Sequence, residues 1–302
     1  MIRLAGIVLL LLVAGCREKQ APRAVAVRED GVLELSLCSF NIRYENDSDR
    51  GWRAWPNRID RVVRTIRRLD PDVLGVQEAL HGQAADLRAS LPDYDFAGIG
   101  RDDGERAGEY AAILYKTDRF EADRAEQGTF WLSDLPEKPG SKTWGNSVVR
   151  CTTWMRLIDR PTGRGFYIYN THFDHRHQAS RVRSAGLIVE RIANRAHPGE
   201  PVVLLGDFNA VESNPAVRQF TSAGLTDPYH SLHRHEENRR TLHFWSGDAG
   251  GALKVDHILV SKGAVFEAAG IDRAPSRKLQ PSDHFPVWAK VRWPESDQDQ
   301  DG

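Results

Sequence analysis

The sequence predicts a chain of the α/β (α+β) class, folded as a four-layer α/β/β/α sandwich in which helices flank two mainly antiparallel β-sheets. Three observations favour this fold. Many short apolar segments have the composition of strands, and few helical segments separate them, which is typical of two sheets packed face to face. The 302 residues, 40% of them hydrophobic, suffice for one large core, and no shift in composition divides them into two domains.

The first residues have the features of a secretory signal. An apolar run over residues 4–13 follows Arg3, and it is shorter than the roughly 20 residues that a membrane-spanning helix needs. The run ends in Val13-Ala14-Gly15-Cys16, which resembles the bacterial lipobox, whose cysteine receives diacylglycerol. We therefore expect a lipoprotein signal peptide at residues 1–15 and lipidation of Cys16, with a plain secretory signal as the alternative. A protein anchored in this way lies in the bacterial cell envelope, outside the cytoplasm, facing the periplasm or the cell surface.

The pattern after Cys16 changes at residue 32. Residues 16–31 are polar, carry no apolar period, and are expected to form a tether. Leu33, Leu35 and Leu37 then alternate with more polar residues, which predicts a strand that runs to Asn41. We expect one folded domain over residues 32–293, followed by a disordered acidic tail at residues 294–302.

The next segment predicts a helix. Apolar residues at positions 59, 62, 63, 66 and 69 recur at helical spacing and form one face. The arginines Arg58, Arg61, Arg64 and Arg68 are expected on the solvated outer face, and a nucleic-acid-binding stripe is the alternative. The formal net charge of the chain is only −1, which argues against a protein that coats nucleic acid.

The remaining elements follow from the same kinds of pattern. Apolar segments rich in β-branched and aromatic residues predict strands at residues 73–76, 110–115, 148–158, 166–169, 202–205, 255–260 and 287–291. A second helix is expected at residues 179–196, with an inner face formed by Val182, Ala185, Val189 and Ile192. Asn214-Pro215 predicts the start of a third helix, and Gly224 predicts its end.

Two cysteines remain in the folded domain. Cys38 and Cys151 both lie in apolar, strand-like segments, which favours buried free thiols. A disulfide in an oxidising compartment is the alternative, and the spacing of the cysteines leaves it open.

Several polar residues that suit catalysis lie at or near the ends of predicted strands, where a side chain can point into a cleft. They are Asn41, Glu78, His172, Asp207, Asn209, Asp256, Asp283 and His284. Any one of them alone is more typical of a turn or a helix cap. As a set they offer carboxylate and amide oxygens, which are the ligands of Mg²⁺ and Mn²⁺, and no histidine pair at zinc spacing joins them.

In their order along the chain, these residues and their neighbours resemble the endonuclease/exonuclease/phosphatase superfamily. The matching blocks are Ser39-Phe40-Asn41, Gln77-Glu78, Asn170-Thr171-His172, Gly206-Asp207-Phe208-Asn209, Val255-Asp256-His257-Ile258 and Ser282-Asp283-His284-Phe285-Pro286. They identify residues 32–293 as a catalytic domain of this type. The chain departs from many relatives before the fifth block, where Thr241-Leu242-His243-Phe244-Trp245 replaces a Thr-Phe-x-Gly-Phe segment. The specificity associated with this loop is therefore not carried over.

The resemblance implies a hydrolase of phosphate esters that depends on Mg²⁺, or on Mn²⁺, as its cofactor. Glu78 is expected as the first metal ligand, with Asn41 beside it and Asp283 as a further or water-mediated contact. Arg43 and Arg150 are candidate contacts for the substrate phosphate, because a guanidinium group binds phosphate in fork geometry. A surface ion pair is the alternative for each arginine.

The resemblance also implies the catalytic residues. Asp207 is expected to act as the base for an attacking water, while Asn209 holds that water or a phosphate oxygen. His172 and His284 are expected to donate hydrogen bonds to phosphate oxygens, and Asp256 to orient His284 and raise its pKa. Relatives use the histidine at the position of His284 as a base or as a phosphate clamp, and both roles stay open.

The leading interpretation is a metal-dependent phosphoesterase that acts outside the cytoplasm, with phosphodiesterase or nuclease-like activity placed first. The alternatives are a phosphomonoesterase that acts on inositol or sugar phosphates, and a non-catalytic surface lipoprotein that binds its ligand. The sequence has no basic stripe of the kind that binds duplex DNA, which favours small or single-stranded substrates. We expect a monomer that has no obligate protein partner and contacts the membrane through its lipid anchor.

Overall fold

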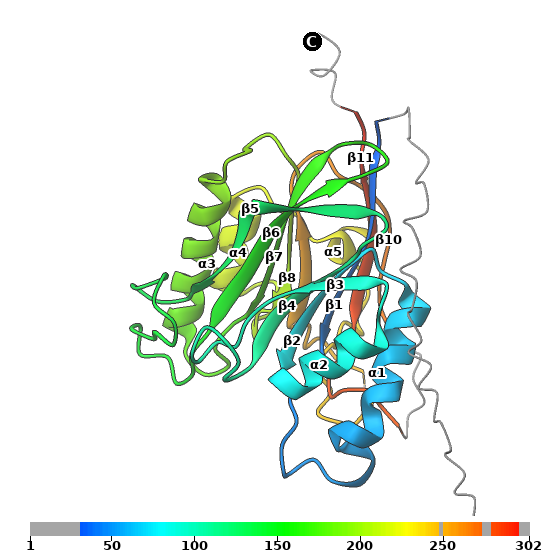
Figure 1. The fold of residues 1–302 in the computed structure, drawn as a ribbon, viewed down its shortest axis with the longest axis vertical. Coiled ribbons are helices and arrows are strands. Elements are labelled where there is room, and N and C mark those ends of the chain that lie inside the picture. The colour runs from blue at the N-terminus through cyan, green and yellow to red at the C-terminus, as the bar shows by residue number, and fades with distance from the viewer. Residues whose placement is uncertain (1–30, 248–249, 274–278, 296–302) are drawn as a thin grey trace, which may run out of the picture.

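Two β-sheets packed face to face form the centre of the computed structural model, which describes residues 31–247, 250–273 and 279–295 (Figure 1). The first sheet has the strand order β10 (Val265–Ile271), β11 (Val287–Trp293), β1 (Leu33–Asn41), β2 (Val73–Ala79), β4 (Tyr110–Lys116) and β3 (Tyr94–Ala97). The second has the order β5 (Phe120–Trp131), β6 (Cys151–Asp159), β7 (Gly165–His172), β8 (Val202–Asp207) and β9 (Asp256–Val260). Within each sheet one neighbouring pair is parallel, β1–β2 and β7–β8, and the others are antiparallel.

Helices cover the outer face of each sheet (Figure 1). The 3₁₀ helix η1 (Gly51–Arg53) leads into α1 (Trp55–Leu69), and α1 and α2 (His81–Ser90) cover the first sheet. The second sheet is covered by α3 (Gln178–Ala193) and α4 (Pro215–Ser222). The short helix α5 (Pro228–Leu232) packs against β9 and β10. The predicted four-layer sandwich is confirmed.

The alternation of side chains along the strands explains the layers. Leu33, Leu35 and Leu37 of β1 are buried between the two sheets, whereas Cys38 and Phe40 of the same strand belong to the core beneath α1 and α2. The strand β8 is apolar on both faces, as its continuous run predicts: its residues alternate between the core shared by the sheets and the core beneath α3. Each fully buried aliphatic or aromatic side chain stabilises the fold by about 1.5–3 kcal/mol.

Two predictions about helix faces need correction. Arg58 was assigned to the solvated face of α1, but it is 0% exposed and its guanidinium donates to four backbone carbonyls. Arg64 and Arg68 are exposed as expected. The buried face of α3 is centred on Ala185 and Ile188, and the predicted Val182, Val189 and Ile192 are only partly buried at its margins.

Several elements were not predicted. They are β3, β5, β10, α2 and α5. The strand β5 shows why: most of its central residues are exposed or half-buried, and its register shifts between Asp123 and Gln127, so that neither alternation nor an apolar run marks it. The predicted start of a helix at Asn214-Pro215 and its end before Gly224 are confirmed by α4. At its start, the Asn214 side chain caps the helix by accepting a hydrogen bond from the Ala216 N–H.

A polar contact joins the two sheets beneath the predicted site. Gln77 of β2 donates to the side-chain oxygen of Asn170 of β7 over 2.7 Å, and Asn170 donates to the backbone oxygens of Val76 and Ala112. These groups are buried, and their hydrogen bonds offset the cost of removing them from water. The blocks Gln77-Glu78 and Asn170-Thr171-His172 therefore each contribute a residue that fixes the sheets relative to one another.

Cys38 and Cys151 are buried and free, as the sequence favours. Burial raises the pKa of the Cys151 thiol to about 12 and that of Cys38 well above its ordinary range, so both remain protonated at neutral pH. The predicted signal peptide, Cys16, residues 17–30 of the tether and residues 296–302 of the tail lie outside the described residues. Within the described residues, every helix is too short or too polar to cross a membrane.

Candidate active site

The predicted site residues come together at one end of the sandwich. Asn41 is the last residue of β1, His172 ends β7, Asp207 ends β8, and Asp256 begins the antiparallel β9. In the second sheet His172 lies opposite Asp207, and Asp207 lies opposite Asp256. A Cβ atom at Gly206 would lie 2.2 Å from the Thr171 carbonyl oxygen, so only glycine lets β8 approach β7 this closely before Asp207.

Asp207 is at the centre of this arrangement and is 1% exposed. Its Oδ2 accepts a hydrogen bond from Asn41 Nδ2 over 3.0 Å, and lies 3.5 Å from His172 Nε2 and 3.8 Å from His284 Nε2. Its Oδ1 accepts from the Asn209 N–H over 2.8 Å. Burial would raise the pKa of Asp207, but the two histidines and these hydrogen bonds outweigh burial and hold the pKa below its ordinary value. Asp207 is therefore ionised at neutral pH.

His284 and Asp256 form an ion pair on one side of Asp207. The distance from His284 Nδ1 to Asp256 Oδ2 is 2.8 Å, and both side chains are buried. Burial would lower the pKa of His284, but the charge and hydrogen bond of Asp256, together with Asp207 and Asp283, raise it to about 10. His284 is therefore an imidazolium at neutral pH, with Nδ1–H held by Asp256 and Nε2–H directed toward Asp207. The orienting role predicted for Asp256 agrees with this geometry.

Asn41, one of the predicted metal ligands, joins Asp207 to Glu78. Asn41 Nδ2 donates to Glu78 Oε1 over 3.0 Å, and Glu78 Oε2 accepts from the Tyr44 N–H over 3.1 Å. The Asn41 oxygen accepts from the Arg43 N–H, so the amide turns its nitrogen rather than its oxygen toward the carboxylates. Burial raises the pKa of Asp283, and the nearby Glu78 carboxylate adds to this rise.

This donor set suits a hard divalent cation. One ligand atom each of Glu78, His172 and Asp207 lies within 4.8 Å of the others, and the same holds for Asp207, Asp256 and His284. Carboxylate oxygens crowd a site where burial and mutual repulsion already raise the pKa of Asp283. A cation such as Mg²⁺ would neutralise that repulsion.

The two predicted phosphate contacts occupy different places. Arg43 is half-buried at the rim of the site, where its Nε donates to Asp49 over 2.9 Å and lies 4.0 Å from Asp283. Burial would lower its pKa, but the carboxylates of Asp283, Asp49 and Glu78 raise it. Arg150 is 5% exposed and lies behind His172, away from the centre of the site. Arg43 could thus contact a phosphate bound at the site. Arg150 is buried behind His172 and is not in a position to make the predicted phosphate contact.

Arg150 fixes the orientation of His172. Its Nη1 contacts His172 Nδ1 over 2.9 Å and Glu109 Oε2 over 3.1 Å, and the same Glu109 carboxylate accepts a further bond from Arg101 over 2.9 Å. Arg150 and Glu109 thus contact the Nδ1 edge of the His172 ring, and His172 Nε2 faces Asp207 Oδ2 at 3.5 Å. Glu109 and Arg101 were missed by sequence analysis because they lie in a segment of mixed charge that resembles an ordinary surface loop.

We expect Arg150→Met to lower kcat about tenfold and to leave KM nearly unchanged, because His172 would lose the partner that fixes the orientation of its ring. Steady-state kinetics test this, and Arg160→Met, an exposed arginine in the turn after β6, is the matched control. A raised KM with normal kcat would instead make Arg150 a substrate contact.

Arg58 is a second residue that sequence analysis misplaced. Its guanidinium donates to the carbonyl oxygens of Ile42, Arg43 and Pro281, and so joins the segment after Asn41 to the segment before Asp283. Burial lowers its pKa to about 10, which leaves it charged at neutral pH. Arg58 therefore holds two site segments together that are far apart in the sequence.

Arg58→Met is expected to lower the free energy of unfolding by about 3 kcal/mol or more, because it leaves several buried carbonyls without a charged donor. Urea denaturation measures this loss. Arg64→Met, an exposed arginine on the same helix, should change stability by less than about 0.5 kcal/mol. Equal effects of the two substitutions would contradict the assigned role of Arg58.

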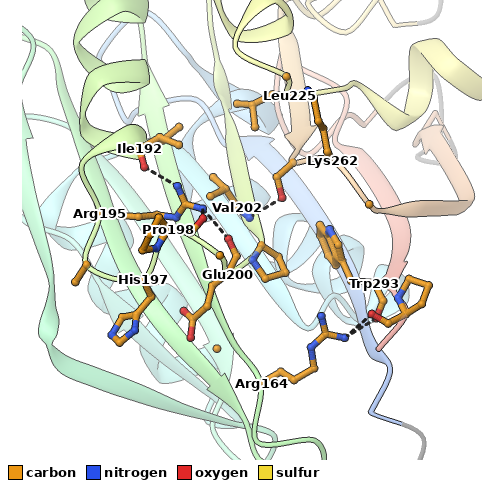
Figure 2. Close-up of a pocket in the computed structure, with 18 of the residues that line it drawn as sticks. Arg164, Ile192, Arg195, His197, Pro198, Glu200, Val202, Leu225, Lys262 and Trp293 are labelled. Atoms are coloured by element: carbon orange, nitrogen blue, oxygen red, sulfur yellow. Dashed lines mark hydrogen bonds between the residues drawn. The ribbon is translucent and has the colours of Figure 1, made fainter. Parts of the chain in front are cut away.

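A cavity of about 1120 Å³ lies at the opposite end of the sandwich (Figure 2). Its wall includes Gly165 and Val202, which begin β7 and β8, and Trp293, which ends β11. Arg164 and Arg195 at this cavity donate to backbone carbonyls of the chain around them. None of the predicted site residues lines it, so its size does not make it the active site.

Comparisons with known proteins show the family. Residues 38–284 match the profile of the Endonuclease/Exonuclease/phosphatase family. A crystal structure of an endonuclease/exonuclease/phosphatase from Bacteroides vulgatus is 34% identical, with a TM-score of 0.78 over 86% of this chain and 98% of that one. A mannosyl-6-phosphatase from Bacteroides thetaiotaomicron is 32% identical, with a TM-score of 0.76 over 85% of this chain and 99% of that one.

A more distant similarity is to a longer protein. Protein angel homolog 2 of Mus musculus is 22% identical over 207 residues, which are 66% of this chain and 37% of the mouse protein. The matched region thus spans little more than a third of that relative.

Proposed function

This chain belongs to the endonuclease/exonuclease/phosphatase family and is a phosphoesterase, and from that premise we propose that it is a phosphomonoesterase acting on a sugar phosphate, with Mg²⁺ or Mn²⁺ as cofactor. The observation that carries this proposal is the likeness to a mannosyl-6-phosphatase at 32% identity over 99% of that chain. Sequence analysis placed a phosphodiesterase first and a monoesterase second. The likeness favours the second.

The charges of the site support a compact, strongly anionic substrate. A phosphate monoester carries up to two negative charges, and the imidazolium of His284 lies beside the ionised Asp207. Arg43 adds a guanidinium group at the rim. Glu78, with Asn41 and Asp283, would hold the cation, which supplies charge neutralisation at the phosphoryl oxygens when bound.

The residues of the chain perform the remaining steps of the proposed reaction. Water attacks phosphorus, the bond from phosphorus to the ester oxygen breaks, and the water proton passes to Asp207. His284 Nε2–H and His172 Nε2–H donate to the phosphoryl oxygens as negative charge develops on them, a preorganised contribution. Asn209, whose N–H already holds Asp207 Oδ1, keeps that carboxylate aligned. The leaving oxygen takes up a proton from solvent and departs as a sugar hydroxyl, and Asp207 returns the proton of the attacking water to solvent.

A panel of esters tests the proposal. The purified chain would be assayed with mannose 6-phosphate, p-nitrophenyl phosphate and bis-p-nitrophenyl phosphate, each with Mg²⁺, Mn²⁺ or EDTA. We expect metal-dependent hydrolysis of the two monoesters at rates at least about tenfold above that of the diester. An enzyme discriminates between substrates by how strongly it stabilises the transition state of each. Faster cleavage of the diester would restore the diesterase, and no turnover of any ester would favour a binding protein.

We also propose that the mature chain is a monomer that begins at a lipidated Cys16 and acts outside the cytoplasm. The start of β1 at Leu33 and the predicted metal ligand Asn41 are at opposite ends of the strand, roughly 27 Å apart at strand rise. A tether attached at Leu33 would direct the active site away from the membrane and toward soluble substrates. Partition of the wild type, but not of Cys16→Ser, into a detergent phase tests the anchor. Equal partition would exclude it.

A further inference from the structure

The cavity at the far end of the sandwich brings together three cationic side chains from separate segments of the chain (Figure 2). Arg164 lies in the turn between β6 and β7, Arg195 follows α3, and Lys262 lies in the turn between β9 and β10. All three line the cavity, and none of them takes part in the proposed reaction. Their convergence at the end opposite the active site therefore calls for a separate explanation.

The positive charge of the cavity is poorly compensated. The hydrogen bonds of Arg164 and Arg195 go to neutral backbone carbonyls. Over the described ranges of the chain, neither arginine forms an ion pair, and Lys262 forms none either. Of the two carboxylates in the wall, Glu200 already pairs with an arginine of β6 at 2.7 Å, which leaves only Glu295. A cavity with this balance of charges favours an anion.

The wall between the cations is apolar. Val202, Leu225 and Trp293 contribute buried side chains to it. A Cβ atom at Gly224 would lie 2.8 Å from Lys262 Cε, so the stem of the exposed lysine occupies the space that this glycine leaves. The volume of about 1120 Å³ is ample for an organic ligand. The lining therefore suits a phosphate attached to an apolar body better than a bare ion.

The chain enters the folded domain at the rim of this cavity. Arg164 Nη1 donates to the Gly31 carbonyl over 2.9 Å and to the Trp293 carbonyl over 2.7 Å. Residues 16–30 span at most roughly 50 Å when fully extended. A lipid on Cys16 would therefore keep the cavity end of the sandwich close to the membrane, with the active site at the opposite end.

We propose that the cavity binds the headgroup of an anionic phospholipid, so that the domain rests on the membrane with its active site facing outward. Lys262 is exposed and contacts the lipid phosphate, while Arg164 and Arg195 add positive charge from the other walls. The glycerol backbone and first acyl carbons of the lipid contact the apolar lining. This inference goes beyond the proposed function, and it takes only its setting from the proposed lipid anchor.

Binding to vesicles tests the cavity without the anchor. The chain would be made from residue 16 with Cys16→Ser, which lacks the lipid and keeps every residue that the structure describes. Sedimentation with phosphatidylcholine vesicles, with and without phosphatidylglycerol, measures its affinity. We expect binding that requires phosphatidylglycerol, and we expect Lys262→Ala to weaken it about fivefold, the contribution of one cation at an anionic membrane. Lys138→Ala, which removes an exposed lysine between β5 and β6 at the active-site end, should leave the affinity unchanged.

A second pair of variants adds a carboxylate where there is open space. A Cβ atom at Gly199, which lines the cavity, meets nothing within 4 Å, and the same holds at Gly82 of α2. Gly199→Glu should weaken vesicle binding about fivefold or more, because it places a like charge beside the lipid phosphate. Gly82→Glu, in the helix that follows the end of β2, is the matched control and should bind as the unsubstituted chain does. Thermal unfolding verifies the fold of each variant.

Three outcomes would overturn the proposal. The first is vesicle binding that does not require phosphatidylglycerol, or that the controls weaken as much as the cavity variants. The second is absence of vesicle binding together with calorimetric binding of glycerol 3-phosphate that Lys262→Ala weakens, which would assign a soluble phosphate ester to the cavity. The third is binding by a chain that ends at Glu295 but not by the chain that keeps residues 296–302, which would make that acidic segment the occupant. None of these measurements uses turnover, so failure of the proposed phosphomonoesterase would leave them unaffected.

Discussion

Asp207→Asn is expected to lower kcat at least about 100-fold, the scale on which acid–base and electrostatic contributions act. Asparagine has the shape of aspartate but cannot accept the proton of the attacking water, and its amide cannot balance the charge of His284 at 3.8 Å. An asparagine oxygen at the Oδ1 position would still accept from the Asn209 N–H, whereas the amide nitrogen that replaces Oδ2 could not accept from Asn41 Nδ2. Steady-state assays on the best monoester, with Mn²⁺ in excess, measure the effect.

The control for this change is Asp118→Asn. Asp118 is an exposed carboxylate in the turn between β4 and β5, at the far end of the sandwich, and its amide should leave kcat within twofold of the wild type. Thermal unfolding of each variant verifies that the fold is intact. An Asp207→Asn enzyme that is folded and turns over at a near-normal rate would remove Asp207 from the reaction.

Asp256→Asn is expected to move the alkaline limit of activity to lower pH. In the wild type Asp256 and the neighbouring carboxylates raise the pKa of His284 to about 10, so the imidazolium donor persists through neutral pH. Without the Asp256 charge, less opposes the effect of burial, and the pKa of His284 falls. The descending limb of the kcat profile should then move from near pH 10 toward roughly pH 7, the ordinary range of histidine.

The same linkage predicts a change of stability with pH. Because the folded-state pKa of His284 is above its unfolded value, its ion pair stabilises the fold fully below about pH 6.5 and loses this contribution as the pH rises through about 10. Asp256→Asn should therefore lose most stability, relative to the wild type, at neutral and acidic pH. Profiles of kcat and unfolding that are superimposable for the two proteins would show that Asp256 does not set the charge of His284.

The sequence predicted which polar residues lie close together where chain order and strand pattern determine position. Asn41, His172 and Asp207 each end a strand whose alternation or apolar run is visible in the sequence. The two strands of the pair β1–β2 are parallel, and so are those of the pair β7–β8. Within each pair the C-terminal ends of the two strands therefore lie side by side. Placing polar residues at the ends of such strands was therefore enough to bring them together.

The positions of arginine side chains were harder to predict. Arg58 and Arg61 lie less than one turn apart on α1, yet Arg58 is buried against segments about 15 and 220 residues away, as its bonds to Arg43 and Pro281 show. Arg150 is similar, since Glu109 and His172 are distant in sequence but adjacent in space. Local periodicity reports the face of an element and carries no information about which long-range partner meets it.

The backbone of the site was also beyond sequence analysis. Positive φ angles at Arg43, Glu78 and Asn209 aim side chains in ways that residue type alone does not indicate, since none of them is glycine. The Asn41 amide, predicted as a metal ligand, is directed by the Arg43 N–H so that its nitrogen joins the Glu78 and Asp207 carboxylates. Its role as a ligand stays a prediction.

The central claim is that Glu78 and its neighbours gather around one hard divalent cation at the end of the sandwich. Anomalous diffraction from a crystal soaked in Mn²⁺ tests this most directly. We predict one strong peak with a Glu78 carboxylate oxygen at roughly 2.2 Å, and with the Asp207 and His284 side chains facing the same cavity. A peak far from Glu78, or none at this end of the molecule, would contradict the account.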